Sequence, residues 1–238
     1  MWPVGPFGPS LPLYLLNAQH PTLSRAHQVG PFAGDVETLT LLDLLEQCLS
    51  EPFFDQLRTQ QQLGYSVSCG VRQTYGMMGF CFQVVSSAHP VPHVQAAVTA
   101  FVDRIAALLT DLPVDELTNH INSLVSDKSK PDTSLHDAAS VFWDQITGEA
   151  PIDFLQRQRQ VEYLRGRDVE AVRRALLALV ARYLLDAATC RVLLVQASLE
   201  ASFRTAELGS AEPTLGSAVV CRTAQDVHAQ GTQVVMKR

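Results

Sequence analysis

The chain has 238 residues, of which 47% are hydrophobic, and its 18 Lys and Arg against 24 Asp and Glu give a net charge of −6. This length allows one substantial core with appendages, and this hydrophobic fraction excludes an intrinsically disordered protein. The acidic balance disfavours a partner bound mainly through its phosphates, so no nucleic-acid partner is expected.

The apolar runs and the cysteines indicate the environment of the chain. Its longest uninterrupted apolar run, residues 175–181, is far shorter than the ~20 residues of a transmembrane helix, so no membrane partner is expected. The N-terminal segment has no basic region and is interrupted by prolines, which argues against a signal peptide. The five cysteines are odd in number and form no Cys-x-x-Cys pair, a pattern typical of reduced thiols. We therefore predict a cytoplasmic protein.

Residues 1–33 are rich in proline and glycine. Six of the 13 prolines lie within the first 31 residues, where neither a helical nor an alternating period survives. We expect this segment to be a tail or a truncated lead-in, in which no strand before the first helix is evident. Residues 11–19 are a candidate for a remnant strand.

The regular pattern begins after residue 34. Apolar residues at helical spacing predict an amphipathic helix that ends near residue 57: Val36, Leu39, Leu42, Leu45 and Cys48. Residues 64–72 and 76–86 are rich in Val, Phe, Tyr and Met around a glycine-containing link, which predicts a β-hairpin. Cys69 and Cys81 could face each other across it, but we interpret them as buried thiols.

Helical periodicity dominates the rest of the chain. Helices are predicted from residue 92 through 108, over 114–128, 134–147 and 152–164, and from an Asp168 cap to residue 183. Residues 190–197 fit a buried strand, although periodicity alone does not separate a strand from a helical turn. The expected fold class is α+β, with an antiparallel hairpin or sheet packed against four to five helices in residues 34–200. Residues 201–238 form a polar tail in this interpretation.

Common catalytic signatures are missing from the sequence. No phosphate-binding loop, dinucleotide motif or nucleophile elbow is present, and none of the seven histidines adjoins a glutamate. His89 and His93 are four residues apart, but Pro90 keeps His89 out of a helical turn, so we interpret them as a loop and a helix start. The arginines between 157 and 174 alternate with acidic residues, which favours a salt-bridged surface over an anion site.

One stretch, residues 51–82, carries a recognisable pattern. Its elements are Glu51-Pro52, Phe54, Leu57-Arg58-Thr59, Leu63-Gly64-Tyr65 and Gly79-Phe80. This pattern resembles the C-terminal lobe of the insulin-degrading enzyme and nardilysin group in the pitrilysin family of zinc metallopeptidases. Looser similarity extends over residues 34–198.

The resemblance implies that the two lobes of the enzyme have different roles. In that family two lobes form a clamshell, zinc is bound in the N-terminal lobe, and the C-terminal lobe supplies an Arg and a Tyr that contact substrate. Those residues correspond to Arg58 and Tyr65 here, as auxiliary catalytic contacts, with Gly64 and Ser66 as substrate-binding neighbours. No metal ligand or other cofactor is expected in this chain, and zinc is implied only for the complete enzyme.

Two functions remain open at this point. In the first, the chain binds peptide substrates, pairs with a zinc-bearing N-terminal lobe and stabilises negative charge on the scissile carbonyl. The strand that begins near Tyr65 could also pair with an extended peptide. In the second, the chain is an inactive peptide- or protein-interaction module. A structural interpretation also exists, with Arg58 at a helix C-terminus and Tyr65 as an ordinary strand residue.

Overall fold

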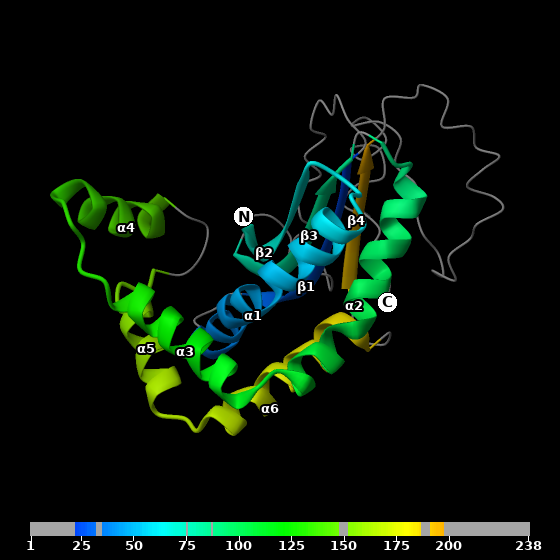
Figure 1. Ribbon diagram of the computed structural model, residues 1–238. Helices are drawn as coiled ribbons and strands as arrows, with labels where there is room; N and C mark the ends of the chain where they lie inside the picture. Colours follow the sequence, from blue (N-terminus) through cyan, green and yellow to red (C-terminus); the bar gives the residue numbers. More distant parts are fainter. Residues whose placement is uncertain are drawn as a thin grey trace.

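The computed structural model describes residues 22–31, 35–74, 76–86, 88–147, 152–186 and 191–197. Along the chain these residues form β1 (Thr22–Pro31), α1 (Val36–Phe54), η1 (Asp55–Gln60), β2 (Ser66–Thr74), β3 (Met77–Val85), α2 (Val91–Asp111), α3 (Val114–Ser129), α4 (Leu135–Thr147), α5 (Gln156–Arg165), α6 (Val169–Val180), η2 (Ala181–Leu185) and β4 (Arg191–Ala197). The two η segments are π-helical. Helix α1 lies between the sheet and an arc of α2, α6, α3 and α5, whereas α4 lies apart from the sheet (Figure 1).

The sheet is antiparallel and has the strand order β2-β3-β1-β4. Strands β2 and β3 form the expected hairpin, which turns at Gly76, where φ is 70°. Residues 191–197 are a strand paired with β1, so the strand interpretation of this segment is confirmed. The α+β class is likewise confirmed. Six α-helices are present in the described ranges, one for each of the six predicted helical segments, so the expected total of four to five was too low.

Strand β1 corrects the prediction for the N-terminal segment. Residues 22–31 are not a tail, because they form a 10-residue strand that pairs with β3 on one side and β4 on the other. Polar residues such as His27 and Gln28 are buried in this strand. The sequence therefore lacks the alternation of apolar and polar residues that is typical of a strand with one solvent-exposed face. The candidate strand at residues 11–19 lies outside the described residues.

Four phenylalanines join the sheet to two helices. Phe53 of α1, Phe80 and Phe82 of β3 and Phe101 of α2 are fully buried. The ring centroids of Phe53 and Phe101 are 4.9 Å apart, and those of Phe53 and Phe82 are 5.3 Å apart. Buried aromatic contacts of this kind add to the hydrophobic free energy of the core. The hairpin is therefore held rigidly against the C-terminal half of α1.

Helix boundaries mostly agree with the predicted ones. Asp168 caps α6 by accepting a hydrogen bond from the Glu170 N–H at 3.2 Å, as expected. Helix α5 begins at residue 156 rather than 152, and α1 changes to a π-helix after Phe54. None of the helices in the described ranges has the length and hydrophobicity needed to cross a bilayer.

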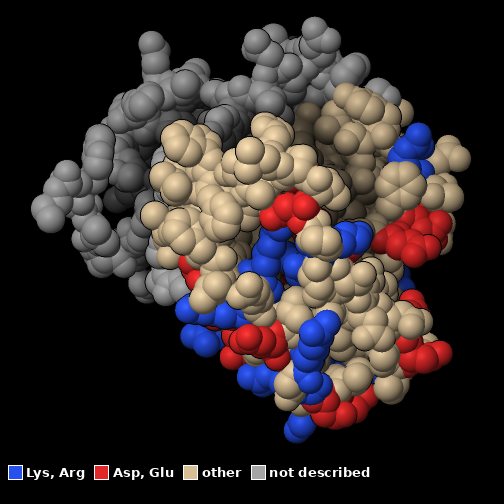
Figure 2. All heavy atoms as spheres, turned by 90° about the vertical axis from the view of Figure 1, so that its left-hand side faces the viewer, with Lys and Arg blue, Asp and Glu red and all other residues tan. Residues whose placement is uncertain are grey.

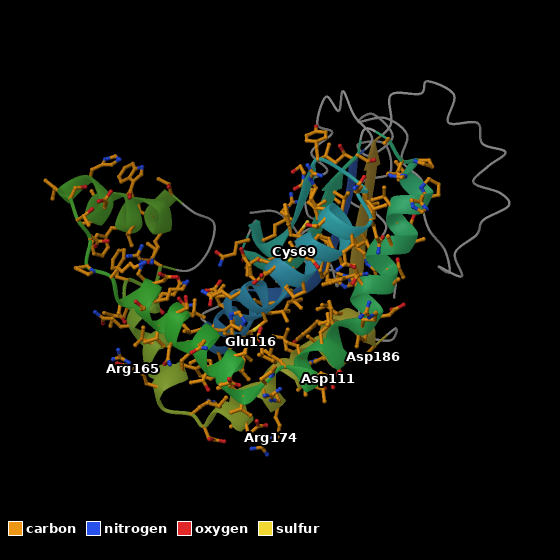
Figure 3. All side chains as sticks on the ribbon, viewed as in Figure 1. Cys69, Asp111, Glu116, Arg165, Arg174 and Asp186 are labelled. Carbon is orange, nitrogen blue, oxygen red and sulfur yellow. The ribbon has the colours of Figure 1, made fainter. Side chains whose placement is uncertain are left out.

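The hairpin cysteines do not face each other. Cys69 is opposite Phe82 in the register, and Cys81 is opposite Gly70, so the two thiols are one position out of step and lie on opposite faces. Both are free thiols. Cys69 is buried beneath α1 (Figure 3), and burial raises its pKa to about 12, whereas Cys81 is only half-buried.

Candidate functional site

The end of α1 positions Arg58. Pro52 has no N–H to donate within α1, and three residues later the helix widens into η1, where the N–H of Gln61 donates to the Gln56 carbonyl at 3.1 Å. π-Helical turns are rare in proteins, and those that occur often lie at functional sites. Leu57 is fully buried and anchors this turn, while the neighbouring Arg58 is half-buried. The guanidinium of Arg58 has no hydrogen bond or ion pair with any side chain in the described ranges.

A tight connection leads from η1 to β2. Gln62 has a positive φ of 51°, which reverses the chain, and the N–H of Leu63 then donates to the Leu57 carbonyl at 2.9 Å. A Cβ atom at Gly64 would lie 2.3 Å from the Val85 carbonyl oxygen, so only glycine fits there. The close packing of Gly64 against Val85 therefore holds this connection in place.

Tyr65 combines a fixed backbone with an accessible side chain. Its N–H donates to the Val85 carbonyl at 3.0 Å, which ties it to β3. Its side chain is 54% exposed, and the next residue, Ser66, is also exposed. The structure thus gathers the four predicted site residues at one corner, with Arg58 at the helix end and Gly64, Tyr65 and Ser66 at the strand start. This location is also compatible with the structural interpretation of Arg58 and Tyr65.

Glu46 of α1 contacts the edge strand β2 further along from this corner, a contact that the sequence pattern did not indicate. One of its carboxylate oxygens accepts a hydrogen bond from the Val71 N–H at 2.9 Å, and a Cβ atom at Gly70 would meet the same carboxyl group at 2.9 Å. Strand β2 is at the sheet edge, so Glu46 occupies one of the donors that an added strand would need. Glu46 and Val71 are 25 residues apart, and no local spacing rule links them.

His27 is the most strongly perturbed histidine in the described part of the chain. It is fully buried in β1, and its Nε2 accepts a hydrogen bond from the Arg25 Nε at 3.0 Å. Burial, together with the charge of Arg25, lowers the pKa of His27 to about 3. The imidazole is therefore neutral at neutral pH and acts as a hydrogen-bonded part of the core.

The arginine-rich segment is mainly an ion-paired surface, as predicted. Arg157 pairs with Asp132 at 3.2 Å and Arg159 with Asp153 at 3.0 Å. Figure 3 shows Arg165 and Arg174 directed outward from α5 and α6.

Arg173 departs from that prediction. It is buried, and its Nη1 donates to the carbonyls of Leu109 and Leu112, each at 2.7 Å. Its guanidinium therefore satisfies carbonyls that the last turn of α2 leaves unpaired. Arg173 has a structural role, not that of a surface charge.

The described residues contain no cluster of three or more His, Cys, Asp or Glu side chains that could bind a metal ion. His89 precedes α2 and His93 lies in its first turn, which confirms the interpretation as a loop and a helix start. Their ring centroids are 5.2 Å apart, but no third candidate ligand joins them among these residues. A zinc ion of the kind expected for the family does not fit the described side chains.

Comparisons with known proteins define the class of the domain. Residues 44–143 match the family described as PQQ synthase PqqF-like, C-terminal lobe domain 4. A nardilysin-like protein of Arabidopsis thaliana is 36% identical over 121 residues, which are 50% of this chain and 12% of that protein. Insulin-degrading enzyme of Drosophila melanogaster is 32% identical over 128 residues, which are 54% of this chain and 13% of that protein.

Solved structures agree on the fold. The crystal structure of pitrilysin has a TM-score of 0.63 at 19% identity, over 77% of this chain and 19% of pitrilysin. An inactive peptidase domain from Bordetella parapertussis has a TM-score of 0.57 at 14% identity, over 78% of this chain and 97% of that domain. Residues 44–143 are therefore similar to a C-terminal-lobe domain of this kind, and the described residues share the fold of pitrilysin domains. The matched segment spans only 12–13% of the length of these curated relatives.

Proposed function

We propose that this chain acts as a C-terminal-lobe domain of a zinc metalloendopeptidase that degrades peptides, with the zinc held by a separate N-terminal lobe. In this role it binds peptide backbone and assists transition-state stabilisation. The observation that carries the proposal is the corner formed by Arg58 and Tyr65. It lies within the family match at residues 44–143, its backbone is tied to β3, and the Tyr65 side chain is exposed.

The chemistry of the corner fits this role. Negative charge develops on the oxygen of a peptide carbonyl when water attacks it, and donors placed about 3 Å away stabilise that charge. The Tyr65 hydroxyl is a neutral donor, and the Arg58 guanidinium is a cationic one. In the proposal, Gly64 contributes backbone groups and Ser66 an exposed hydroxyl to the same substrate. Peptide bond hydrolysis by this chain alone is not expected.

The edge strand offers a second contact to an extended peptide. Strand β2 begins beside Tyr65 and is the outer strand of the sheet, so a peptide can pair with it by strand addition. Glu46 already occupies the Val71 N–H, which limits such pairing to the half of β2 nearest Tyr65. A bound peptide would therefore be directed toward the Arg58 and Tyr65 corner.

Reconstituted peptide hydrolysis tests the proposal. The full chain is combined with a zinc-bearing lobe, and kcat/KM is measured for Tyr65→Phe and Arg58→Gln. Loss of one donor to the developing charge is expected to lower kcat/KM by about 10²-fold. Tyr163→Phe is the matched control, because its hydroxyl donates to Glu37 at 2.9 Å, away from the corner. An unaltered rate for Tyr65→Phe contradicts the proposal.

The alternative function is an interaction module without catalytic contribution. One observation favours it: a structural neighbour from Bordetella parapertussis is described as an inactive peptidase domain. Under both functions the double variant Arg58→Gln with Tyr65→Phe is expected to bind its partner. Only the catalytic proposal predicts that this variant loses the assisted hydrolysis.

A further inference from the structure

Arg58 is a cation without a charged partner in the described part of the chain. Elsewhere on the surface, opposite charges are combined: Figure 2 shows positive and negative side chains next to one another, and Arg157 pairs with Asp132 at 3.2 Å. Arg58 is only half-buried, yet it forms no hydrogen bond or ion pair with a side chain in the described ranges. Its guanidinium is therefore free to donate to a carbonyl oxygen or an anion.

The absence of an ion pair at Arg58 is unexpected from the sequence. Asp55, the nearest acidic residue along the chain, lies three positions before Arg58. An acidic and a basic residue at this spacing are neighbours on a helix and stabilise each other. In the structure the Asp55 Oδ2 instead accepts a hydrogen bond from the Gln60 Nε2 at 2.6 Å. Gln60 thus occupies the carboxylate that the local spacing would give to Arg58.

The π-helical turn η1 makes the bond between Asp55 and Gln60 possible. An α-helix has 3.6 residues per turn, so side chains five positions apart point about 140° away from each other. The backbone bonds of a π-helix join residues five positions apart, which brings such residues to one face. In η1 the Gln61 N–H donates to the Gln56 carbonyl at 3.1 Å, and the side-chain bond has the same spacing. The widened turn therefore places the Gln60 amide beside the Asp55 carboxylate.

The turn is also held by contacts that do not involve this bond. Leu57 is fully buried, and Arg104 of α2 donates from its Nη1 to the Gln56 Oε1 at 3.3 Å. Asp55 and Gln60 are both exposed, so replacing either one leaves neither a cavity nor a buried unpaired group. We therefore expect a Gln60 variant to change the partner of Asp55 without unfolding η1.

We propose that Gln60 is a positioning residue, which holds the Asp55 carboxylate and so keeps the Arg58 guanidinium free for substrate. The inference rests on the proposed function, because it explains how the corner keeps one of its two donors available. Asp55 does not touch the substrate in this proposal. Without the Gln60 amide, Asp55 pairs with Arg58 and reduces the positive charge that Arg58 offers to a scissile carbonyl.

Rescue of a Gln60 variant by a second change at Asp55 tests the proposal. In reconstituted hydrolysis with a zinc-bearing lobe, Gln60→Ala is expected to lower kcat about two- to fivefold with KM unchanged, because one exposed ion pair competes with the transition state. The double variant Gln60→Ala with Asp55→Ala is expected to restore the parental kcat, since no carboxylate then competes for Arg58. A purely structural role of Gln60 would leave the double variant at least as impaired as the single one.

Gln61→Ala is the matched control. Gln61 is the same residue type at the next position, it is exposed, and its side chain forms no hydrogen bond within the described ranges. This variant is expected to keep the parental kcat. Equal thermal melting of all variants excludes a folding defect.

A second measurement uses the full chain alone and does not depend on catalysis. A carboxylate bound to a guanidinium protects its N–H groups from exchange with solvent, and NMR can follow the exchange of the Arg58 Nε–H. This exchange is expected to be about two- to fivefold slower in Gln60→Ala than in the parent, and parental again in the double variant. If Arg58→Gln leaves assisted hydrolysis unchanged, the proposed function fails, and the Nε–H exchange alone decides the role of Gln60.

Three results overturn the inference about Gln60. The first is parental exchange of the Arg58 Nε–H in Gln60→Ala, or a parental kcat of this variant in an enzyme that Arg58→Gln impairs. The second is a double variant in which Asp55→Ala does not restore kcat. The third is an equal loss of kcat when Gln60→Ala is introduced into the Arg58→Gln variant, because Gln60 then does not act through Arg58.

Discussion

Phe53 and Phe101 meet nearly edge to face with ring centroids 4.9 Å apart, and Phe142 and Phe154 meet in the same way at 5.2 Å. The first pair is fully buried between α1, α2 and the sheet, whereas the second is about half exposed. The ring geometry is therefore the same, and only the number of surrounding elements differs. This comparison shows that aromatic contacts stabilise the core where several elements converge, and that elsewhere the same contacts leave large apolar side chains exposed.

The largest difference is expected between Phe82→Ala and Phe142→Ala. Phe82 contacts rings from α1, α2 and β3, so its removal leaves a cavity and lowers the free energy of unfolding by about 3–5 kcal/mol. Phe142→Ala removes a half-exposed ring and is expected to change it by less than about 0.5 kcal/mol. Urea denaturation of the two variants measures both values. Equal losses would contradict the contrast between the two aromatic groups.

Gly64→Ala tests whether the site corner belongs to the rigid region. The added Cβ atom meets the Val85 carbonyl oxygen at 2.3 Å and the Val84 Cγ1 at 3.2 Å, so the β2 and β3 backbones must separate. A loss of about 1–3 kcal/mol in unfolding free energy is expected. Ser68→Ala, at an exposed position of the same strand, is the control and should melt like the parent. A Gly64→Ala variant of parental stability would mean that the corner is not tightly packed.

The titration of His27 makes the stability of the buried core depend on pH. Its pKa is lowered to about 3 in the folded chain from 6.5, so the unfolded chain binds the proton more readily. The contribution of His27 to the free energy of unfolding is fully present above about pH 6.5 and is lost as the pH falls toward 3. Between about pH 7 and about pH 5 the expected loss is about 2 kcal/mol.

Urea denaturation at the two pH values measures the His27 effect. His27→Gln should remove this part of the pH dependence. His93→Gln should retain it, because His93 lies in an exposed first turn of α2. A parental pH slope in His27→Gln contradicts the assignment of this loss to His27.

The smallest effect is expected at the hydrogen bond between Gln145 of α4 and Asp153. Gln145→Ala removes the acceptor for the Asp153 N–H and should cost about 0.5–1 kcal/mol, confined to α4. Amide hydrogen exchange distinguishes local from global opening, because α4 amides should exchange faster while α1 amides keep their protection. Faster exchange throughout the molecule would show that α4 is coupled to the core.

Local pattern was sufficient for most elements and for part of the site. The periodicity of Val36 to Cys48 predicted α1, and the Gly76 link predicted the hairpin. Motif spacing selected Arg58 and Tyr65, which the structure gathers at one corner. It did not reveal β1, because a central strand is stabilised by ladders on both sides and tolerates buried polar residues.

The sequence also did not predict the π-helical turn or the contact of Glu46 with Val71. Leu57 is buried where α1 changes to η1, and the Glu46 contact joins residues that are 25 positions apart. Both are consequences of how α1 lies on β2. No propensity or spacing rule contains that geometry.

The sequence by itself determined the α+β class, the order of the helices and the motif residues, because these depend on periodicity and spacing along the chain. Tertiary structure decided which apolar residues are buried. Phe82 and Phe142 are the same residue type, but only Phe82 is enclosed by several elements. The free energy of apolar burial depends on the area removed from water, and that area is set by contacts between distant segments of the chain.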